Sequence, residues 1–127
     1  MKTNKNSIFY FFMSAAFLFS SSSCIKDNVI KTDVLIIGGG TSGISAGIQS
    51  SRLNAKTVII EESTWLGGML TAAGVSAVDG NYKLPSGMWG EFKDSLTNYY
   101  GTPEALKTGW VSNVLFEPSV GDKIFKN

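Results

Sequence analysis

The sequence predicts an α/β fold built on a parallel sheet, and three observations lead to this class. Two runs of aliphatic and β-branched residues stand at positions 34–37 (VLII) and 57–60 (TVII), each long enough for one strand. The stretch between them is typical of a helix, and a cluster of glycines separates it from the first run. A strand, a helix and a second strand in this order form a βαβ unit, in which the two strands are parallel.

The first expected strand, Val34–Ile37, leads into the pattern G-x-G-x-x-G at residues 38–43 (GGGTSG), which we call the glycine loop. In such a loop Gly38 permits the tight turn, Gly40 lets the backbone approach a pyrophosphate, and Gly43 lets the next helix pack closely on the strand. The pattern alone is weak, so the elements around it decide whether it binds a dinucleotide.

A helix is expected over residues 41–53, starting inside the glycine loop. Thr41 and Ser42 fall in its first turn, where backbone N–H groups lack partners within the helix and can bind phosphate. Both are therefore candidate binding residues. Asn54 follows the helix and is one of the few non-glycine residues that tolerate a left-handed helix end.

The second expected strand, Thr57–Ile60, is followed by Glu61 and Glu62. A carboxylate at this point accepts hydrogen bonds from the ribose hydroxyls of a bound dinucleotide, so both acids are candidate ribose ligands. Strand, glycine loop, helix, strand and acid occur in the required order, which predicts a dinucleotide site. The alternative is a glycine turn without phosphate in another kind of α/β protein.

This segment resembles the FAD-dependent oxidoreductases of the glutathione-reductase-like kind, which have two dinucleotide-binding domains. Glu61 stands at the position of the family's ribose-binding glutamate, and Gly67-Gly68 follows the second strand. In the family, two glycines there bring the loop close to the pyrophosphate and ribityl parts of the flavin, whereas the alternative is a simple turn. The resemblance implies a Rossmann-like FAD-binding βαβ start of a parallel sheet, with FAD as the cofactor.

From Asp33 to Asn127 the chain also resembles one exported bacterial branch of these oxidoreductases, some members of which are labelled xanthan lyase. The residues that carry this likeness are 66–71 (LGGMLT), 79–80 (DG), 86–92 (SGMWGEF) and 116–118 (FEP). The resemblance implies a small-molecule or saccharide-related substrate of unknown identity. No catalytic acid, base or nucleophile can be named in this chain.

The remaining pattern predicts a short strand within residues 74–78 and a helix that ends at Gly101. Further helix starts are expected at Pro103 and Pro118. The core-facing side chains of the helix before Gly101 are expected to be Trp89, Phe92, Leu96 and Tyr99. So few strands leave a parallel sheet incomplete in this chain, and we expect residues 32–127 to be the N-terminal part of an FAD-binding domain.

Residues 1–23 have the organisation of a signal peptide. Lys2 and Lys5 form a basic start, residues 8–19 (IFYFFMSAAFLF) form an apolar segment, and four serines follow at residues 20–23. Twelve residues rise only about 18 Å as a helix, which is too short for a hydrocarbon core of roughly 30 Å. A signal segment fits this length better than a membrane-spanning helix does.

Cys24 resembles the lipid-attachment cysteine of bacterial lipoproteins, because small residues at the end of an apolar segment precede it. Ser21 departs from the pattern, which prefers leucine three positions before the cysteine. The resemblance implies a lipidated tether at residues 24–31 and an exported protein anchored in the cell envelope, in the periplasm or at the outer membrane or surface. The alternative is an incidental free thiol after an ordinary cleavage site.

Composition excludes several other classes of function. The chain contains no histidine and only one cysteine, which excludes a Ser-His-Asp triad and a His-ligated metal site. Without Lys2 and Lys5 it has nine basic and ten acidic residues, so no nucleic-acid-binding face is expected. The leading hypothesis is a flavin-dependent oxidoreductase. The alternatives are a nicotinamide-dependent Rossmann dehydrogenase and a non-catalytic surface lipoprotein.

Overall fold

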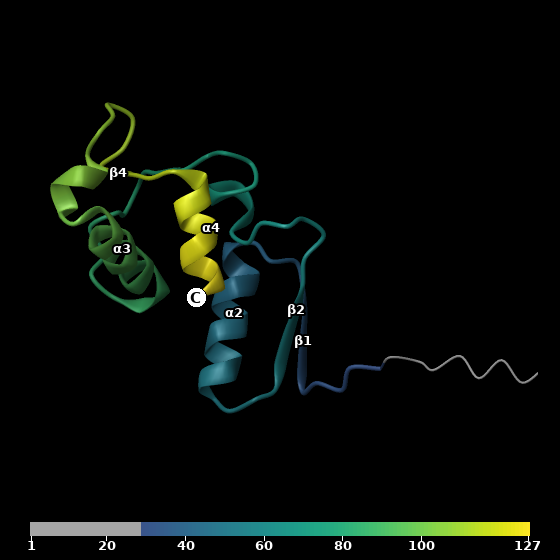
Figure 1. Ribbon diagram of the computed structural model, residues 1–127. Helices are drawn as coiled ribbons and strands as arrows, with labels where there is room; N and C mark the ends of the chain where they lie inside the picture. The colour runs from purple at the N-terminus through teal and green to yellow at the C-terminus, as the bar shows by residue number, and fades with distance from the viewer. Residues whose placement is uncertain (1–28) are drawn as a thin grey trace, which may run out of the picture. The chain divides into compact units, whose positions relative to one another are not determined.

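The computed structural model describes residues 29–127 (Figure 1), so the predicted signal peptide and Cys24 lie outside the described residues. The chain divides into two units, residues 1–30 and 31–127, and every element below belongs to the second. The strands and helices are β1 (Val34–Ile37), α2 (Thr41–Arg52), β2 (Thr57–Ile60), β3 (Ala77–Val78), α3 (Gly87–Tyr100), β4 (Val114–Leu115) and α4 (Pro118–Lys126). Short 3-10 helices form at Gly68–Leu70 and Pro103–Leu106.

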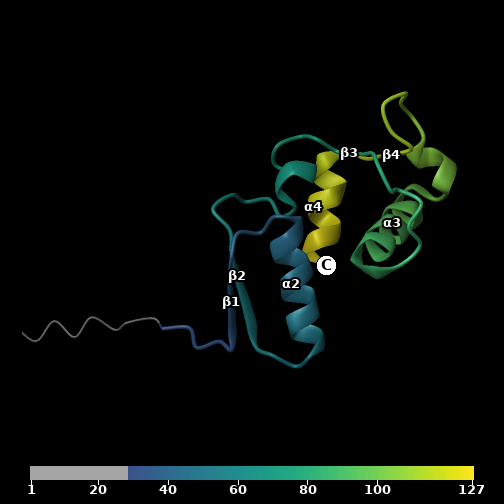
Figure 2. The same cartoon turned by 180° about the vertical axis from the view of Figure 1, so that it is seen from behind.

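The predicted βαβ unit is confirmed. Strands β1 and β2 pair in parallel, in a register that runs from Val34 opposite Thr57 to Ile37 opposite Ile60. Helix α2 packs on one face of this pair, and in both views it lies between the strands and α4 (Figures 1 and 2). The packing is close at Gly47, where a Cβ atom would lie 2.6 Å from Cδ1 of Ile59. Glycine at this position lets α2 approach the sheet without displacing the side chain of Ile59.

The opposite face of the β1–β2 pair has no helix from residues 31–127 against it. Leu35, Ile37 and Ile60 are 53%, 74% and 52% exposed on that face. Parallel sheets ordinarily have both faces covered, and their strands are apolar on both sides for this reason. In the described residues the parallel sheet has two strands, which leaves one apolar face open to solvent.

A second, antiparallel pair joins β3 to β4, with Ala77 opposite Leu115 and Val78 opposite Val114. The strand predicted within residues 74–78 is therefore present but only two residues long. Gly74 and Gly80 bound it with φ values of +72° and +73°, and backbone in this left-handed region cannot continue a strand.

A compact apolar core lies between α3, α4 and β4. Its buried members are Phe92, Leu96, Leu106, Val114, Phe116 and Val120. The ring of Phe92 stacks on that of Phe125 with centroids 4.5 Å apart and meets Phe116 edge to face at 5.4 Å. These aromatic pairs fix α4 against α3, in an arrangement that aromatic quadrupoles favour.

The expected core stripe of α3 is confirmed at Phe92 and Leu96 and is wrong at Tyr99, which is 53% exposed. Tyr100 packs against the core instead, since it lies four residues after Leu96 on the same helix face. Its hydroxyl accepts a hydrogen bond of 3.0 Å from the backbone N–H of Glu117, at the start of α4. The core-facing residue after Leu96 is therefore the one four positions later, Tyr100, and not the one three positions later, Tyr99.

The predicted helix ends agree with the structure. Asn54 after α2 and Gly101 after α3 have φ values of +63° and +92°, and Pro118 occupies the first turn of α4. The helix expected from Pro103 is a single 3-10 segment, capped by the Thr102 hydroxyl that accepts from the N–H of Ala105. Among residues 29–127, no helix is both long enough and apolar enough to cross a membrane.

Candidate dinucleotide site

The glycine loop makes the tight turn from β1 into α2. Gly38 has a φ of +100°, and its N–H donates to the carbonyl oxygen of Ile60 at 2.8 Å, which ties the end of β1 to the end of β2. A Cβ atom on Gly43 would collide with the carbonyl oxygen of Gly38. The fold itself therefore requires glycine at both positions, as the sequence pattern predicts.

Gly40 differs from these two glycines because the fold does not require it. Its φ of −66° suits any residue, and a Cβ atom built there meets nothing within 4 Å. The residue precedes the first turn of α2, where the N–H groups of Thr41, Ser42 and Gly43 have no partner within the helix. Helix α2 has no side-chain cap and no acidic residue in that turn. The open space beside Gly40 and the free N–H groups fit a pyrophosphate.

Glu61 follows β2 and directs its carboxylate at the glycine loop. Oε2 accepts a hydrogen bond of 2.5 Å from the N–H of Gly39, and Oε1 accepts one of 3.0 Å from the N–H of Ser63. These bonds, first that of Ser63 and then that of Gly39, lower the pKa of Glu61 below its ordinary value. The second predicted acid, Glu62, is exposed, and no hydrogen bond of its side chain is found within the described residues.

Gly67 and Gly68 lie directly against the glycine loop. The N–H of Gly67 donates to the carbonyl oxygen of Gly39 at 2.8 Å, and Gly67 forms a parallel bridge with Gly40. A Cβ atom on Gly68 would lie 3.2 Å from the Cα of Gly40, so the two backbones are in contact. We call residues 64–68, which carry this pair, the diglycine loop.

The structure thus brings together the predicted glycines, the first turn of α2 and Glu61, while Glu62 stands apart. Sequence reasoning missed Asp122 of α4, whose Oδ1 accepts a hydrogen bond of 2.7 Å from the N–H of Leu66. This contact joins residues 56 positions apart and involves a backbone group, so no sequence motif predicts it.

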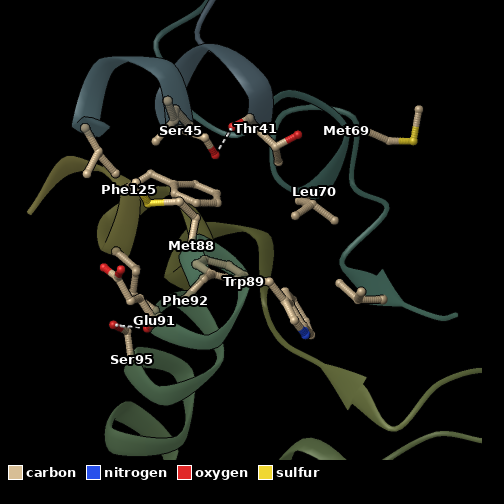
Figure 3. Close-up of a pocket in the computed structure, with 14 residues that line it drawn as sticks. Thr41, Ser45, Met69, Leu70, Met88, Trp89, Glu91, Phe92, Ser95 and Phe125 are labelled. Carbon is tan, nitrogen blue, oxygen red and sulfur yellow. Dashed lines mark hydrogen bonds between the residues drawn. The ribbon is translucent and has the colours of Figure 1, made fainter. Parts of the chain in front are cut away.

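A cavity of about 510 Å³ adjoins the glycine loop between α2, α3 and α4 (Figure 3). Side chains of Met88, Trp89, Phe92 and Phe125 make its wall largely apolar, and Thr41 joins it to the glycine loop. This volume lies within the range of roughly 300–1,000 Å³ that is usual for small-molecule sites. The cavity can therefore accept an apolar group next to a bound phosphate.

Glu91 is the acidic side chain on the wall of this cavity. Arg52 donates to both of its oxygens, Nη1 to Oε1 at 2.9 Å and Nη2 to Oε2 at 2.5 Å. This hydrogen-bonded pair lowers the pKa of Glu91 and raises that of Arg52. Glu91 is accordingly held as an anion, and its environment does not favour proton donation. Residues 29–127 contain neither histidine nor cysteine, and no three of their acidic side chains gather into a group that could hold a metal.

Comparison with known proteins agrees with the geometry. The chain is 37% identical over 92 residues to dihydrolipoyl dehydrogenase 1, mitochondrial, of Arabidopsis thaliana, and 30% identical over 87 residues to carotenoid phi-ring synthase of Chlorobaculum tepidum. It is 39% identical over 51 residues to FAD-dependent oxidoreductase pigF of Monascus ruber. The three alignments cover 72%, 68% and 40% of this chain but only 16%, 13% and 11% of those relatives.

No solved structure matches the chain. A family model described as FAD dependent oxidoreductase matches residues 33–127, which is most of the sequence. This match favours FAD over the nicotinamide dinucleotide considered as an alternative. The chain therefore belongs to the FAD dependent oxidoreductase family, and its cofactor is FAD.

Proposed function

We propose that the protein is an FAD-dependent oxidoreductase and that this part of it binds the adenosine diphosphate portion of the cofactor. The observation that carries the proposal is Gly40, a glycine with ordinary backbone angles and empty space where its side chain would be. The fold has no need of glycine there, whereas a pyrophosphate that approaches the backbone does.

Glu61 is suited to hold the adenosine ribose. A carboxylate has about four acceptor positions, and the N–H groups of Gly39 and Ser63 use two of them. The remaining positions can accept hydrogen bonds from the two ribose hydroxyls. Because the pKa of Glu61 is lowered, the carboxylate stays ionised, and its hydrogen bonds are of the stronger charge-assisted kind.

The remaining parts of the site orient the cofactor. The first turn of α2 directs unpaired N–H groups at the pyrophosphate. The diglycine loop lies beside the glycine loop, where its Gly67 pairs with Gly40. Bound FAD supplies the redox chemistry, the transfer of a hydride or an electron pair. The substrate class implied by the sequence, a small molecule or a saccharide-related compound, is part of this proposal.

The direct test is Gly40→Ala in the natural protein. The substitution is expected to change the free energy of unfolding by less than about 1 kcal/mol, because the methyl group meets no protein atom. The dissociation constant for FAD, measured by quenching of flavin fluorescence, is expected to rise at least about tenfold, which is ~1.4 kcal/mol. Unchanged FAD affinity in the folded variant would refute the proposed role of the glycine loop.

Gly43→Ala is the contrasting variant. Its methyl group would collide with the backbone carbonyl of Gly38, so this change is expected to lower the melting temperature. Comparing the two variants distinguishes a glycine that FAD binding requires, Gly40, from a glycine that the fold requires, Gly43.

We further propose that the protein is exported and anchored in the cell envelope through Cys24, which rests on the sequence of residues 1–24 alone. One acyl chain gives only marginal membrane binding, so several chains on this residue are needed for a stable anchor. Cys24→Ser is expected to release the protein from the membrane fraction or to stall its processing. Recovery of membrane-extracted protein with an unmodified Cys24, as judged by mass spectrometry, would refute lipidation.

A further inference from the structure

We propose that helix α4 sets the position of the diglycine loop for the cofactor, and that Asp122 is the positioning residue. The inference rests on the proposed function, because it assigns a role toward bound FAD. It follows from hydrogen bonds on both sides of the diglycine loop, from the burial of Asp122 and from the contact of this loop with the glycine loop.

On its inner side the diglycine loop is joined to Gly39 by backbone and side-chain contacts. The N–H of Gly67 donates to the carbonyl oxygen of Gly39 at 2.8 Å. The side chain of Leu66 covers Gly39 so closely that a Cβ atom there would lie 2.6 Å from its Cδ2. A displacement of Leu66 or Gly67 therefore moves the wall beside the space at Gly40.

On its outer side the same loop is held by the last two turns of α4. Oδ1 of Asp122 accepts from the N–H of Leu66 at 2.7 Å. Lys126, one turn later, donates from Nζ to Oδ2 of Asp122 and to the carbonyl oxygen of Thr64, both at 2.7 Å. The Asp122–Lys126 ion pair therefore holds the diglycine loop at two backbone groups, the carbonyl oxygen of Thr64 and the N–H of Leu66.

The carboxylate of Asp122 is mostly shielded from solvent and is bound to the N–H of Leu66. Its side chain is 15% exposed, whereas that of Lys126 is 45% exposed. Burial acts to raise the pKa of Asp122, but hydrogen bonds from Lys126 and Leu66 and the charge of Lys126 outweigh it, so the pKa is lowered. The residue is therefore a fixed anionic acceptor for a single backbone N–H.

The peptide groups around Leu66 are fixed on both sides. The carbonyl oxygen of Leu66 accepts from the hydroxyl of Thr71 at 2.6 Å, while its N–H is bound by Asp122. The Phe125 ring of α4 packs behind Gly67, where a Cβ atom would lie 2.7 Å from its Cε2. These contacts orient the N–H of Gly67 toward Gly39. Without Asp122, the N–H of Leu66 loses its acceptor and this orientation is no longer enforced.

Loss of Asp122 is expected to affect one part of the cofactor site and spare another. Glu61 keeps its own hydrogen bonds to Gly39 and Ser63, so the adenosine end retains its ligand. The pyrophosphate end is bordered by the diglycine loop, which depends on Asp122. The role of α4 therefore predicts weaker binding of FAD with little change in binding of AMP, which lacks the pyrophosphate.

The experiment compares Asp122→Ala with Asp94→Ala in the natural protein. Asp94 is a matched control, an exposed aspartate on α3 with no side-chain hydrogen bond within the described residues. Two quantities are measured: hydrogen exchange at the amides of Leu66 and Gly67 in the FAD-free protein, and the dissociation constants of FAD and AMP. Asp122→Asn, which keeps the shape and one acceptor oxygen, is the second variant if Asp122→Ala fails to fold.

In Asp122→Ala we expect exchange at both amides to accelerate at least about tenfold, since a hydrogen bond to a charged acceptor is lost. The dissociation constant of FAD should rise about tenfold and that of AMP less than about twofold. In Asp122→Asn the dissociation constant of FAD should also rise more than that of AMP, but by a smaller factor than in Asp122→Ala. Asp94→Ala should match the wild type.

Unchanged exchange at Leu66 and Gly67, or an equal loss of FAD and AMP binding with a lower melting temperature, would overturn the positioning role. The first result would mean that α4 does not hold the loop, and the second that Asp122 only stabilises the fold. Failure of the wild-type protein to bind FAD would instead refute the proposed function. The exchange measurement still decides whether Asp122 holds the diglycine loop, since it is made without cofactor.

Discussion

Gly39, in the glycine loop, contacts both Glu61 and the diglycine loop. Its N–H donates to Glu61, its carbonyl oxygen accepts from Gly67, and Leu66 lies over its Cα. The G-x-G-x-x-G pattern leaves this position free, yet here a Cβ atom would meet both Leu66 and Glu61, at 2.6 and 3.1 Å. The acid after β2 and the diglycine loop are thus held relative to each other by one buried residue of the glycine loop.

The role of Glu61 leads to a prediction with a matched control. Glu61→Ala in the natural protein is expected to raise the dissociation constant of FAD roughly 10- to 100-fold, because charge-assisted hydrogen bonds to the ribose are lost. Glu62→Ala, which removes the neighbouring exposed acid, is expected to leave it unchanged. Flavin fluorescence quenching measures both. Equal effects of the two substitutions would show that Glu61 is not the ribose ligand.

The lowered pKa of Glu61 predicts a dependence of stability on pH. Because the folded-state pKa lies below the unfolded value, the carboxylate stabilises the fold fully above the ordinary pKa of about 4.3. This contribution is lost as pH falls through the lower folded-state pKa. Thermal unfolding between neutral pH and pH 3 should therefore show the wild type losing its advantage over Glu61→Gln. A constant difference between the two melting temperatures would contradict the assignment.

At the scale of elements, the local sequence pattern predicts a helix, strand or turn correctly wherever interactions between neighbouring residues determine it. The βαβ unit follows from apolar runs and glycine spacing, and the helix ends at Asn54 and Gly101 follow from left-handed backbone angles. The pairing of β3 with β4 joins segments far apart in the sequence, so the pattern of residues 74–78 indicated a strand but not its partner.

The same limit explains which parts of the candidate site were missed. The glycine loop and Glu61 belong to one motif, and the sequence order alone places them at one end of the strands. Asp122 contributes through a hydrogen bond to a backbone group 56 residues away, which depends on how α4 docks. Helical spacing allows either Tyr99 or Tyr100 to follow Leu96 on the core face, and the hydrogen bond from the N–H of Glu117 to the Tyr100 hydroxyl is a contact that helical spacing does not predict.

The packing of α3 gives a prediction at the scale of elements. Leu96 is fully buried in the core, so Leu96→Ala is expected to lower the free energy of unfolding by about 2–5 kcal/mol through lost burial and a residual cavity. Tyr99→Ala on the exposed side of the same helix should cost far less. Denaturant unfolding followed by circular dichroism measures both. A loss for Tyr99→Ala as large as that for Leu96→Ala would mean that Tyr99 is also buried in solution, contrary to its exposed position in the structure.

Taken together, residues 31–127 combine a βαβ unit that is covered on one face with a well-packed core around α3 and α4. Helix α4 contacts both, through Phe125 in the aromatic cluster and through Asp122, which binds the diglycine loop. The Arg52–Glu91 ion pair also joins α2 directly to α3. The diglycine loop and the α3–α4 core are therefore coupled through α4. The side of the molecule formed by the open face of β1 and β2 takes no part in this coupling.

That open face yields the last prediction. Leu35, Ile37 and Ile60 form an exposed apolar row, so a polypeptide of residues 29–127 is expected to self-associate and to enhance the fluorescence of the dye ANS. Replacing Leu35 and Ile37 together by threonine puts β-branched residues, which suit a strand, at both positions and removes apolar surface. This double variant should show weaker ANS fluorescence and less self-association by analytical ultracentrifugation. Val75→Thr, at an exposed apolar residue outside the sheet, is the control and should behave as the parent polypeptide. A monomeric parent without ANS binding would mean that the face of β1 and β2 is covered in solution by residues from this same polypeptide.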